Sequence, residues 1–557
     1  MVANTLSPMG ELAQRSGSID QFADRIAVVV LAVVAVAAAL TFRDYGLGWD
    51  DYTHAQYGDL LLSFYGSGFA DKRALSFVNL YMYGGGFDMA AALIAKLLPF
   101  DLFETRRLVG AMVGIVGLIA TWRTARRLGG PIAGTLALLL LATAPLFFGH
   151  MFMNPKDAPF AVAMILLVLG LVRGCEEYPR LSITTAAILA AGFGLSIGTR
   201  IMGVFGIMYG AAALGTIFTV ETYRDGAAAA AARLGRFLLA LLPVAIVAYA
   251  LMALVWPWSV VEPLNPYRAV AYFSVFFEKP WKEMFDGALV SVPDMPRSYV
   301  PTLFILQTPT LMLTLSVVGL IGGVGAVFRS TLSLQWRAAL LVVVLAAAAP
   351  ILVTVIERPA VYNGIRHFVF VIPPLAVLGG LAGAWLIDRA SRLGGPVVAV
   401  ALGMVAIGFL SPIVELVRLH PYQYTFFNRI AGGIKGADER YMLDYWGLAF
   451  KQASEELRAK LEETHEQPPG RRRWRIAVCG PHAPAEVALG KQFLPTWDPK
   501  GADFAMVLGE FYCAAIDAPV LVEVQREGVV YARVYDIRGR TVSSLFTIPP
   551  VERDDKK

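Results

Sequence analysis

The stretch GRFLLALLPVAIVAYALMALV, residues 235–255, is apolar along almost its whole length and carries a single charge at Arg236. A helix needs roughly 20 apolar residues to cross a bilayer, because the hydrocarbon core offers no water to the backbone polar groups. Similar runs recur along the chain until about residue 416. The pattern predicts a polytopic α-helical membrane protein.

The composition agrees with a lipid environment. Of the 557 residues, 57% are hydrophobic and 16% are charged, which is too apolar for an ordinary soluble enzyme. The net charge of +5 does not indicate a nucleic-acid partner, since the basic residues lie between apolar runs and not in one soluble patch. We expect about eleven spans, and at most about 13. They are predicted near 25–41, 106–122, 131–148, 158–172, 182–198, 202–220, 235–255, 303–327, 338–355, 367–387 and 396–416.

Arginines are concentrated in alternate short loops between the predicted spans. Cytoplasmic loops carry an excess of Lys and Arg, so the asymmetry indicates the orientation. Residues 1–24 are then a cytoplasmic segment, and the chain after the last span lies on the opposite face. The arginines predicted on the cytoplasmic side are Arg123, Arg126, Arg127, Arg173, Arg180, Arg224, Arg233, Arg236, Arg329, Arg337, Arg389 and Arg392.

Three longer stretches fall on the non-cytoplasmic face: 42–105, 256–302 and 417–557. The first contains two short, modestly apolar segments, 52–65 and 86–99, which suit helices that lie at the membrane surface. The site chemistry is therefore expected on this face, opposite the arginine-rich loops.

The end of the apolar runs divides a transmembrane domain at 25–431 from a small α/β domain at 432–557. Within the second domain, 448–463 is typical of a helix, and 519–537 alternates like a β-hairpin. The fold class expected is a helical membrane body with a small domain outside the cytoplasm.

Two cysteines and a glycine run need interpretation. Cys479 and Cys513 lie outside the reducing cytosol, so a disulfide between them stays open, whereas the lack of neighbouring ligands disfavours zinc. The run at 84–86 is Gly-Gly-Gly and follows no predicted strand. We interpret it as a flexible interfacial turn and not as a phosphate loop.

Acidic residues occur at two points of the non-cytoplasmic face. Asp50 and Asp51 follow the first span, and Asp157 ends the run His150–Asp157 between two later spans. A carboxylate near low dielectric can act as a general base toward an acceptor hydroxyl. A helix cap or a solvated loop is the alternative interpretation of each acid.

Cations on the same face could hold a phosphate. Membrane headgroup binding is the favoured alternative for Lys279, Lys282 and Arg358. The pair Arg366-His367 is the better candidate, because it begins a predicted span beside Tyr362 and Asn363. The whole set comprises Arg200, Lys279, Lys282, Arg297, Arg358, Arg366 and His367.

These residues resemble a known family, the GT-C glycosyltransferases of family 39, which includes protein O-mannosyltransferases and lipid A aminoarabinose transferases. The motifs that carry the resemblance are Trp49-Asp50-Asp51-Tyr52-Thr53-His54, Asn154-Pro155-Lys156-Asp157, Tyr362-Asn363-Gly364-Ile365-Arg366-His367 and His420-Pro421-Tyr422-Gln423-Tyr424. The resemblance covers most of the chain and implies an inverting transfer at the outer membrane surface. The donor would be a polyprenyl-phosphate sugar, and the acceptor a lipid, a glycan or a protein.

The resemblance also implies residue roles. Asp50 would be the base, with Asp157 assisting in acceptor binding or metal contact. No cofactor is required, although Asp50, Asp51 and Asp157 could bind a divalent cation. The remaining assignments are acceptor or metal contact for Asp51, His54 and Asn154, and donor-phosphate binding for Lys156, Arg200, Arg366 and His367.

One departure from the family pattern concerns the donor phosphate. Many relatives carry a His-Pro-Pro or Glu-Lys-Pro motif in the first loop, where this chain reads Tyr81-Met82-Tyr83-Gly84-Gly85-Gly86. The phosphate ligand could then come from Lys72, Arg73 or Lys156.

Two other classes of protein were weighed. A transporter or lipid flippase predicts ionisable residues near span midpoints and often repeat symmetry, whereas here the span centres are almost uncharged. A scaffold with an external binding domain is supported only by the tail. The Ala-, Gly- and Arg-rich composition fits a bacterial inner membrane, with the C-terminal domain in the periplasm.

Overall fold

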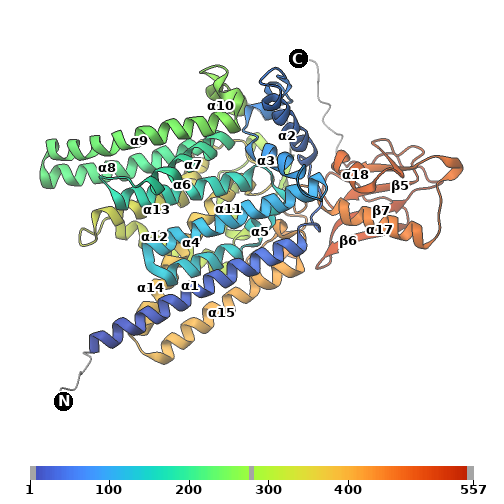
Figure 1. Ribbon diagram of the computed structural model, residues 1–557. Coiled ribbons are helices and arrows are strands. Elements are labelled where there is room, and N and C mark those ends of the chain that lie inside the picture. The colour runs from blue at the N-terminus through green and yellow to red at the C-terminus, as the bar shows by residue number, and fades with distance from the viewer. Residues whose placement is uncertain (1–7, 275–281, 548–557) are drawn as a thin grey trace.

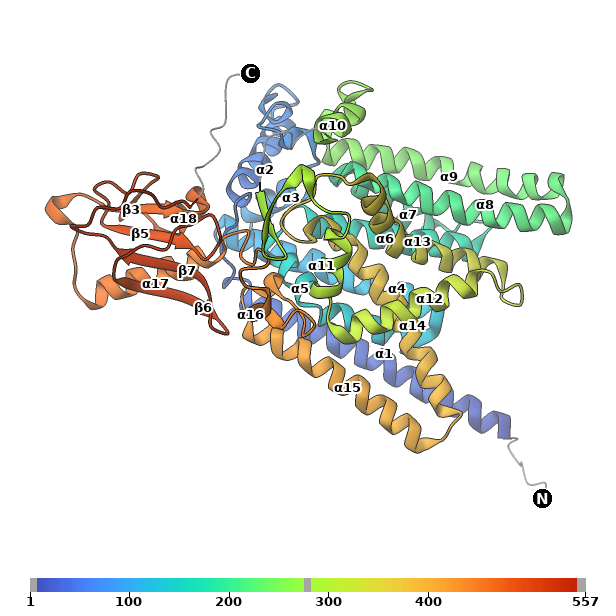
Figure 2. The same ribbon diagram turned by 180° about the vertical axis from the view of Figure 1, so that it is seen from behind.

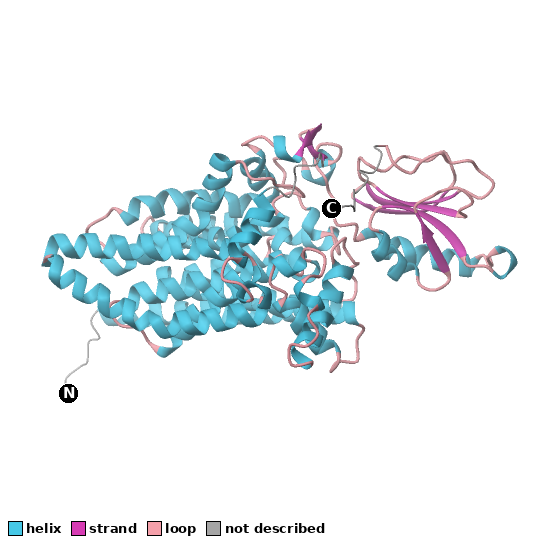
Figure 3. Ribbon diagram, turned by 90° about the horizontal axis from the view of Figure 1, so that it is seen from above, coloured by secondary structure: helices cyan, strands magenta, loops and turns pink. Residues whose placement is uncertain are grey.

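The computed structural model describes residues 8–274 and 282–547. A bundle of long helices forms the body, and a separate sheet domain packs against one end of it, while the first described helix begins at the other end (Figure 1). The view from above shows the strands of this domain gathered beyond the helices (Figure 3). The predicted fold class is confirmed.

Nine helices in the described residues are long and apolar enough to cross a membrane. One of them, α4 (Leu102–Ala142), is two antiparallel arms joined at Gly130, whose φ is +81°. Pro131 follows, and a Cβ on Gly134 would meet Trp122 of the opposite arm. Helix α7 has 17 residues, against 21 in each of α6 and α8. Counting both arms of α4 and adding α7 gives the eleven spans predicted.

The helices of the membrane body lie roughly along one direction (Figure 2). The predicted span at 303–327 is broken before Pro309, since this residue has no backbone N–H and restrains the residue before it. The result is a short α11 and a membrane-crossing α12. The remaining bounds are α1 (Pro8–Thr41), α5 (Pro145–Met153), α6 (Asp157–Glu177), α7 (Ile183–Thr199), α8 (Phe205–Asp225), α9 (Ala227–Val255), α11 (Tyr299–Gln307), α12 (Thr310–Val327), α13 (Leu334–Glu357), α14 (Ile372–Ser391) and α15 (Gly395–Arg418).

The loops at the domain-bearing end contain short elements. Both helices predicted at the membrane surface are present, as α2 and α3, and the second external loop contains an antiparallel hairpin. Their bounds are α2 (Asp51–Gly66), α3 (Gly86–Ala95), α10 (Asn265–Ser274), β1 (Lys282–Phe285) and β2 (Ala288–Ser291).

The interpretation of Gly84-Gly85-Gly86 as a flexible turn is wrong. A Cβ on Gly84 would lie 1.4 Å from the carbonyl oxygen of Gly198, at the end of α7. The Gly85 N–H donates to the Val255 carbonyl at 2.9 Å, at the end of α9. The glycines are needed because the backbone passes closely over two helix ends.

The C-terminal domain is a five-stranded sheet of order β4-β3-β5-β7-β6 with helices beside it. The predicted helix and hairpin are confirmed as α17 and β6–β7, and Cys479 and Cys513 form a disulfide. The bounds are α16 (Gly433–Ala437), α17 (Ala449–Glu463), β3 (Trp474–Cys479), α18 (His482–Leu489), β4 (Phe493–Thr496), β5 (Phe504–Leu508), β6 (Val520–Arg526) and β7 (Val529–Asp536).

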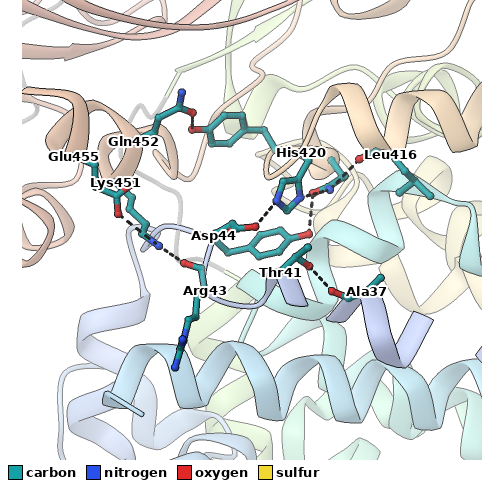
Figure 4. A network of polar contacts seen from close by, with 12 residues as sticks. Ala37, Thr41, Arg43, Asp44, Leu416, His420, Lys451, Gln452 and Glu455 are labelled. Atoms are coloured by element: carbon teal, nitrogen blue, oxygen red, sulfur yellow. Dashed lines mark hydrogen bonds and ion pairs between the residues drawn. The ribbon is translucent and has the colours of Figure 1, made fainter. Parts of the chain in front are cut away.

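The motif that begins at His420 joins the domain to the membrane body. His420 pairs through Nε2 with the carboxylate of Asp44 at 2.8 Å, and through Nδ1 with Gln423 at 3.0 Å. Tyr422 donates to Gln452 of α17 at 2.8 Å. Figure 4 shows this junction between the end of α1, the end of α15 and α17. The motif is thus a structural connection in this chain.

Candidate active site

Asp50 and Asp157 meet at one guanidinium group. Asp50 is the residue before α2, and Asp157 is the first residue of α6. The Nη1 atom of Arg366 lies 3.9 Å from Asp50 Oδ2 and 3.8 Å from Asp157 Oδ2. The two predicted catalytic carboxylates therefore share one site at the domain-bearing end of the bundle.

Two further predicted cations complete the cluster. Arg200, which follows α7, forms an ion pair with Asp157. The buried Lys156 amine lies 4.6 Å from the centre of the Tyr83 ring, and Arg200 lies over the same ring at 5.8 Å. Tyr83 comes from the first external loop, and Lys156 from the loop before α6.

Several guanidinium N–H groups of the cluster have no acceptor among the described residues. They are Nε and Nη1 of Arg366 and Nε of Arg200, all in side chains that are at least nine-tenths buried. Buried donors are almost always hydrogen-bonded in native proteins. With Lys156, the three cations also exceed the two carboxylates by one charge. The site is suited to an anion.

The charges hold Asp50 and Lys156 in useful protonation states. Partial burial alone would raise the pKa of Asp50, but the positive charges of Lys156 and Arg366 outweigh it and hold the pKa below its ordinary value. Burial lowers the pKa of Lys156 to about 8, against the opposing charge of Asp50. Near neutral pH Asp50 is therefore a carboxylate, and Lys156 is an ammonium group.

Asp51 turns away from Asp50. Its side chain is fully buried, accepts from Arg107 at 2.9 and 2.6 Å, and accepts from the Gly48 N–H at 2.7 Å. Within the described residues, no group of three His, Cys, Asp or Glu side chains is arranged to hold a metal ion. The Asp50-Asp51-Asp157 set thus does not converge on one point.

Asn154 is engaged with its own loop. Its Oδ1 accepts from the N–H groups of Lys156 and Asp157 at 3.0 and 2.7 Å, and its Nδ2 donates to Asp157 Oδ2 at 2.9 Å. The structure therefore places Asn154 as a support for the Asp157 carboxylate.

His54 lies one helical turn after Asp50 and is 3% exposed. Its Nδ1 pairs with Asp88 Oδ2 at 2.7 Å, and Arg106 donates to the other oxygen of Asp88 at 2.6 Å. This buried network ties α2 to α3 and α4, so it fixes the helix that begins beside Asp50.

The other predicted cations are dispersed. His367 stacks edge-on against Tyr362 with ring centres 5.0 Å apart. Arg297 donates to the carbonyls of residues 355 and 356 at 2.5 and 3.0 Å, and Arg358 donates to the Met295 carbonyl at 3.1 Å. Both arginines therefore connect a loop to the end of α13. Lys72, Arg73 and Lys282 are exposed, and Lys279 lies outside the described residues.

Some site residues escaped the sequence analysis. The Arg366 guanidinium lies over the Tyr362 ring at 4.8 Å and over the Trp446 ring at 5.5 Å. Trp446 belongs to the aromatic segment 441–446 after α16, and its carbonyl accepts from the Trp49 N–H at 3.2 Å. The chain leading into the C-terminal domain therefore forms part of the site wall. Its dense aromatic content was the one sequence signal for this role.

Solved structures similar to the chain include two of ArnT from Cupriavidus metallidurans. The apo form has a TM-score of 0.47 at 17% identity, covering 94% of this chain and 98% of that chain. The form bound to undecaprenyl phosphate has a TM-score of 0.46 at 18% identity, covering 91% and 97%. The apo Archaeoglobus fulgidus oligosaccharyltransferase has a TM-score of 0.48 at 13% identity, covering 86% and 65%.

The sequence also matches a family model over part of its length. Residues 87–224 match the model described as dolichyl-phosphate-mannose-protein mannosyltransferase. No curated protein matches the chain. The matched segment includes Asp157, Lys156 and Arg200, so the resemblance stated from the sequence motifs is confirmed for this part of the chain.

Proposed function

We propose that the chain is an inverting glycosyltransferase that moves a sugar from a polyprenyl-phosphate donor to a lipid, glycan or protein acceptor. The observation that carries the proposal is the buried cluster of Lys156, Arg200 and Arg366 beside Asp50 and Asp157. Its two arginines have N–H groups with no acceptor among the described residues. The prenyl tail requires lipid, whereas the phosphate requires charge-assisted hydrogen bonds. A charged site at one end of a membrane bundle satisfies both requirements.

The cations would bind the donor phosphate and stabilise it as the leaving group. During transfer, the acceptor oxygen forms a bond to the anomeric carbon from the face opposite the phosphate. The bond from that carbon to the phosphate oxygen breaks, and the phosphate leaves with the electron pair. Negative charge develops on the phosphate, so fixed guanidinium and ammonium groups lower the barrier.

Asp50 would take the proton of the acceptor hydroxyl. Its side chain is 42% exposed, whereas that of Asp157 is 2% exposed. Asp50 is therefore the carboxylate that an incoming acceptor can reach, and its lowered pKa keeps it ionised near neutral pH. Asp157, which pairs with Arg200 and accepts a hydrogen bond from Asn154, would keep the cations in position.

The active site would face the periplasm from a bacterial inner membrane. The predicted cytoplasmic arginines and the cluster occupy opposite ends of the spans, and the positive-inside tendency supports this orientation. The C-terminal domain then lies in the periplasm, an oxidising compartment in which the Cys479–Cys513 disulfide persists.

The test uses the purified full-length chain in lipid nanodiscs with polyprenyl-phosphate sugars, and measures sugar transfer. Asp50→Asn should lower kcat by about 100-fold to 10,000-fold, the usual contribution of a general base. Asp59→Asn is the matched control, since Asp59 is exposed on α2, the helix that begins after Asp50. Transfer by Asp50→Asn at the wild-type rate would reject Asp50 as the base. A wild-type chain inactive with every such donor would reject the proposed function.

A further inference from the structure

The hairpin β1–β2 buries a carboxylate near the active site. Glu283 is 1% exposed and forms no ion pair within the described residues. Its oxygens accept from the Asn363 N–H at 2.7 and 2.9 Å, and Oε1 accepts from the Tyr299 hydroxyl at 3.0 Å. The Tyr299 oxygen in turn accepts from the Gly364 N–H at 3.0 Å.

The backbone that Glu283 contacts has an unusual conformation. Asn363 and Gly364 are consecutive residues in the left-handed region, with φ of +56° and +66°. This conformation is unfavourable for a non-glycine residue unless the surroundings hold it. Here the Asn363 N–H donates to the Glu283 carboxylate directly, and the Gly364 N–H is linked to it through the Tyr299 hydroxyl. Arg366 follows two residues later, at the start of the 3₁₀ turn Arg366–Val371.

We propose that Glu283 is a positioning residue that anchors the Asn363–Gly364 turn and thereby sets the place of Arg366 at the donor phosphate. The functional consequence rests on the proposed function, since it requires Arg366 to bind that phosphate. The anchoring itself does not depend on it.

The anchor is also sensitive to pH. Burial raises the pKa of Glu283 to about 7, although its hydrogen bonds and the charge of Arg366 pull the pKa down. The other titratable groups facing it are Tyr299 from α11, and Tyr445 and Glu510 from the C-terminal part of the chain. As pH falls through about 7, the carboxylate gains a proton and loses the charge that faces Arg366. The anchor should therefore weaken on the acid side.

The first experiment measures the anchor without a transfer assay. Amide hydrogen exchange of a peptide spanning residues 360–370 is compared in the wild type, Glu283→Gln and Lys282→Gln. Lys282 is the matched control, since it is the exposed neighbour on the same strand. Glu283→Gln should speed exchange of the Asn363 and Gly364 amides by at least about tenfold, while Lys282→Gln leaves it unchanged. Equal exchange in all three proteins would overturn the inference.

The second experiment measures the donor KM against pH. In the wild type, the donor KM should rise as pH falls below about 7. In Glu283→Gln the donor KM should equal the acidic wild-type value at every pH, and kcat should fall as well, because a displaced Arg366 stabilises the leaving phosphate less well. The rise of KM at low pH could persist in Glu283→Gln and disappear in Glu510→Gln. That result would assign the pH dependence to Glu510 and overturn the pH role of Glu283.

The two proposals can fail separately. Accelerated exchange in Glu283→Gln together with no transfer by the wild type would support the anchor and reject the proposed function. Should Glu283→Gln not fold, exchange of the same wild-type amides is measured against pH and corrected for intrinsic exchange. A loss of protection below about pH 7 supports the anchor, and constant protection overturns it.

Discussion

Lys156 should set the alkaline limit of catalysis. Only its ammonium form can bind a phosphate oxygen by a charge-assisted hydrogen bond, and its pKa is lowered to about 8. About half of the lysine is protonated at pH 8 and about one tenth at pH 9. If binding follows the ammonium form, kcat/KM for the donor falls about fivefold over that interval.

Two substitutions test this magnitude. Lys156→Arg keeps a positive charge throughout the range, since guanidinium does not deprotonate, so its profile should be flat between about pH 8 and 10. Asp50→Asn removes the charge that raises the Lys156 pKa and should move the residual alkaline limb to lower pH. The assay is the initial rate at low donor concentration in buffers of constant ionic strength. An alkaline limb in Lys156→Arg identical to that of the wild type would refute the reasoning.

Three further predictions concern the framework of the site. Arg107→Met should leave the buried carboxylate of Asp51 unpaired and lower the free energy of unfolding by about 3–5 kcal/mol, measured as a lower Tm in detergent. The double variant Arg107→Met/Asp51→Asn should recover part of this stability, and an unchanged Tm in the single variant would argue against the ion pair. Gly84→Ala places a Cβ 1.4 Å from a carbonyl oxygen at the end of α7, so it should lower Tm and should reduce the transfer rate by at least about tenfold. Wild-type Tm and transfer rate would show that the close approach is absent. The double variant Cys479→Ser/Cys513→Ser, or reduction of the disulfide, should destabilise the C-terminal domain by about 2–4 kcal/mol, measured by limited proteolysis. Equal cleavage rates of the oxidised wild type and the disulfide-free protein would exclude that contribution.

The membrane body could be predicted from the sequence because lipid imposes a simple condition on each span. A long uncharged run satisfies that condition almost regardless of its partners. The exceptions were local. The span at 303–327 is interrupted at Pro309, and the glycines at 84–86 serve close packing, which depends on helices far along the chain.

The site could be predicted only in part. Asp50 and Asp51 are neighbours in the sequence and look equivalent there. In the structure they differ, because Arg107, 56 residues after Asp51, forms an ion pair with Asp51. No local pattern specifies which acid a distant arginine will pair with. Glu283 gave no signal for the same reason, since it lies in a polar loop and becomes buried only against the turn at residues 363–364.

The central claim is that the cations beside Asp50 and Asp157 bind the phosphate of a polyprenyl-phosphate donor. The most direct measurement is a cryo-EM map of the full chain in nanodiscs with undecaprenyl phosphate. The account predicts phosphate density within hydrogen-bond distance of Lys156, Arg200 and Arg366, with the prenyl tail running toward lipid. Phosphate density at the opposite end of the spans, or bound elsewhere while these three side chains stay unliganded, would contradict it.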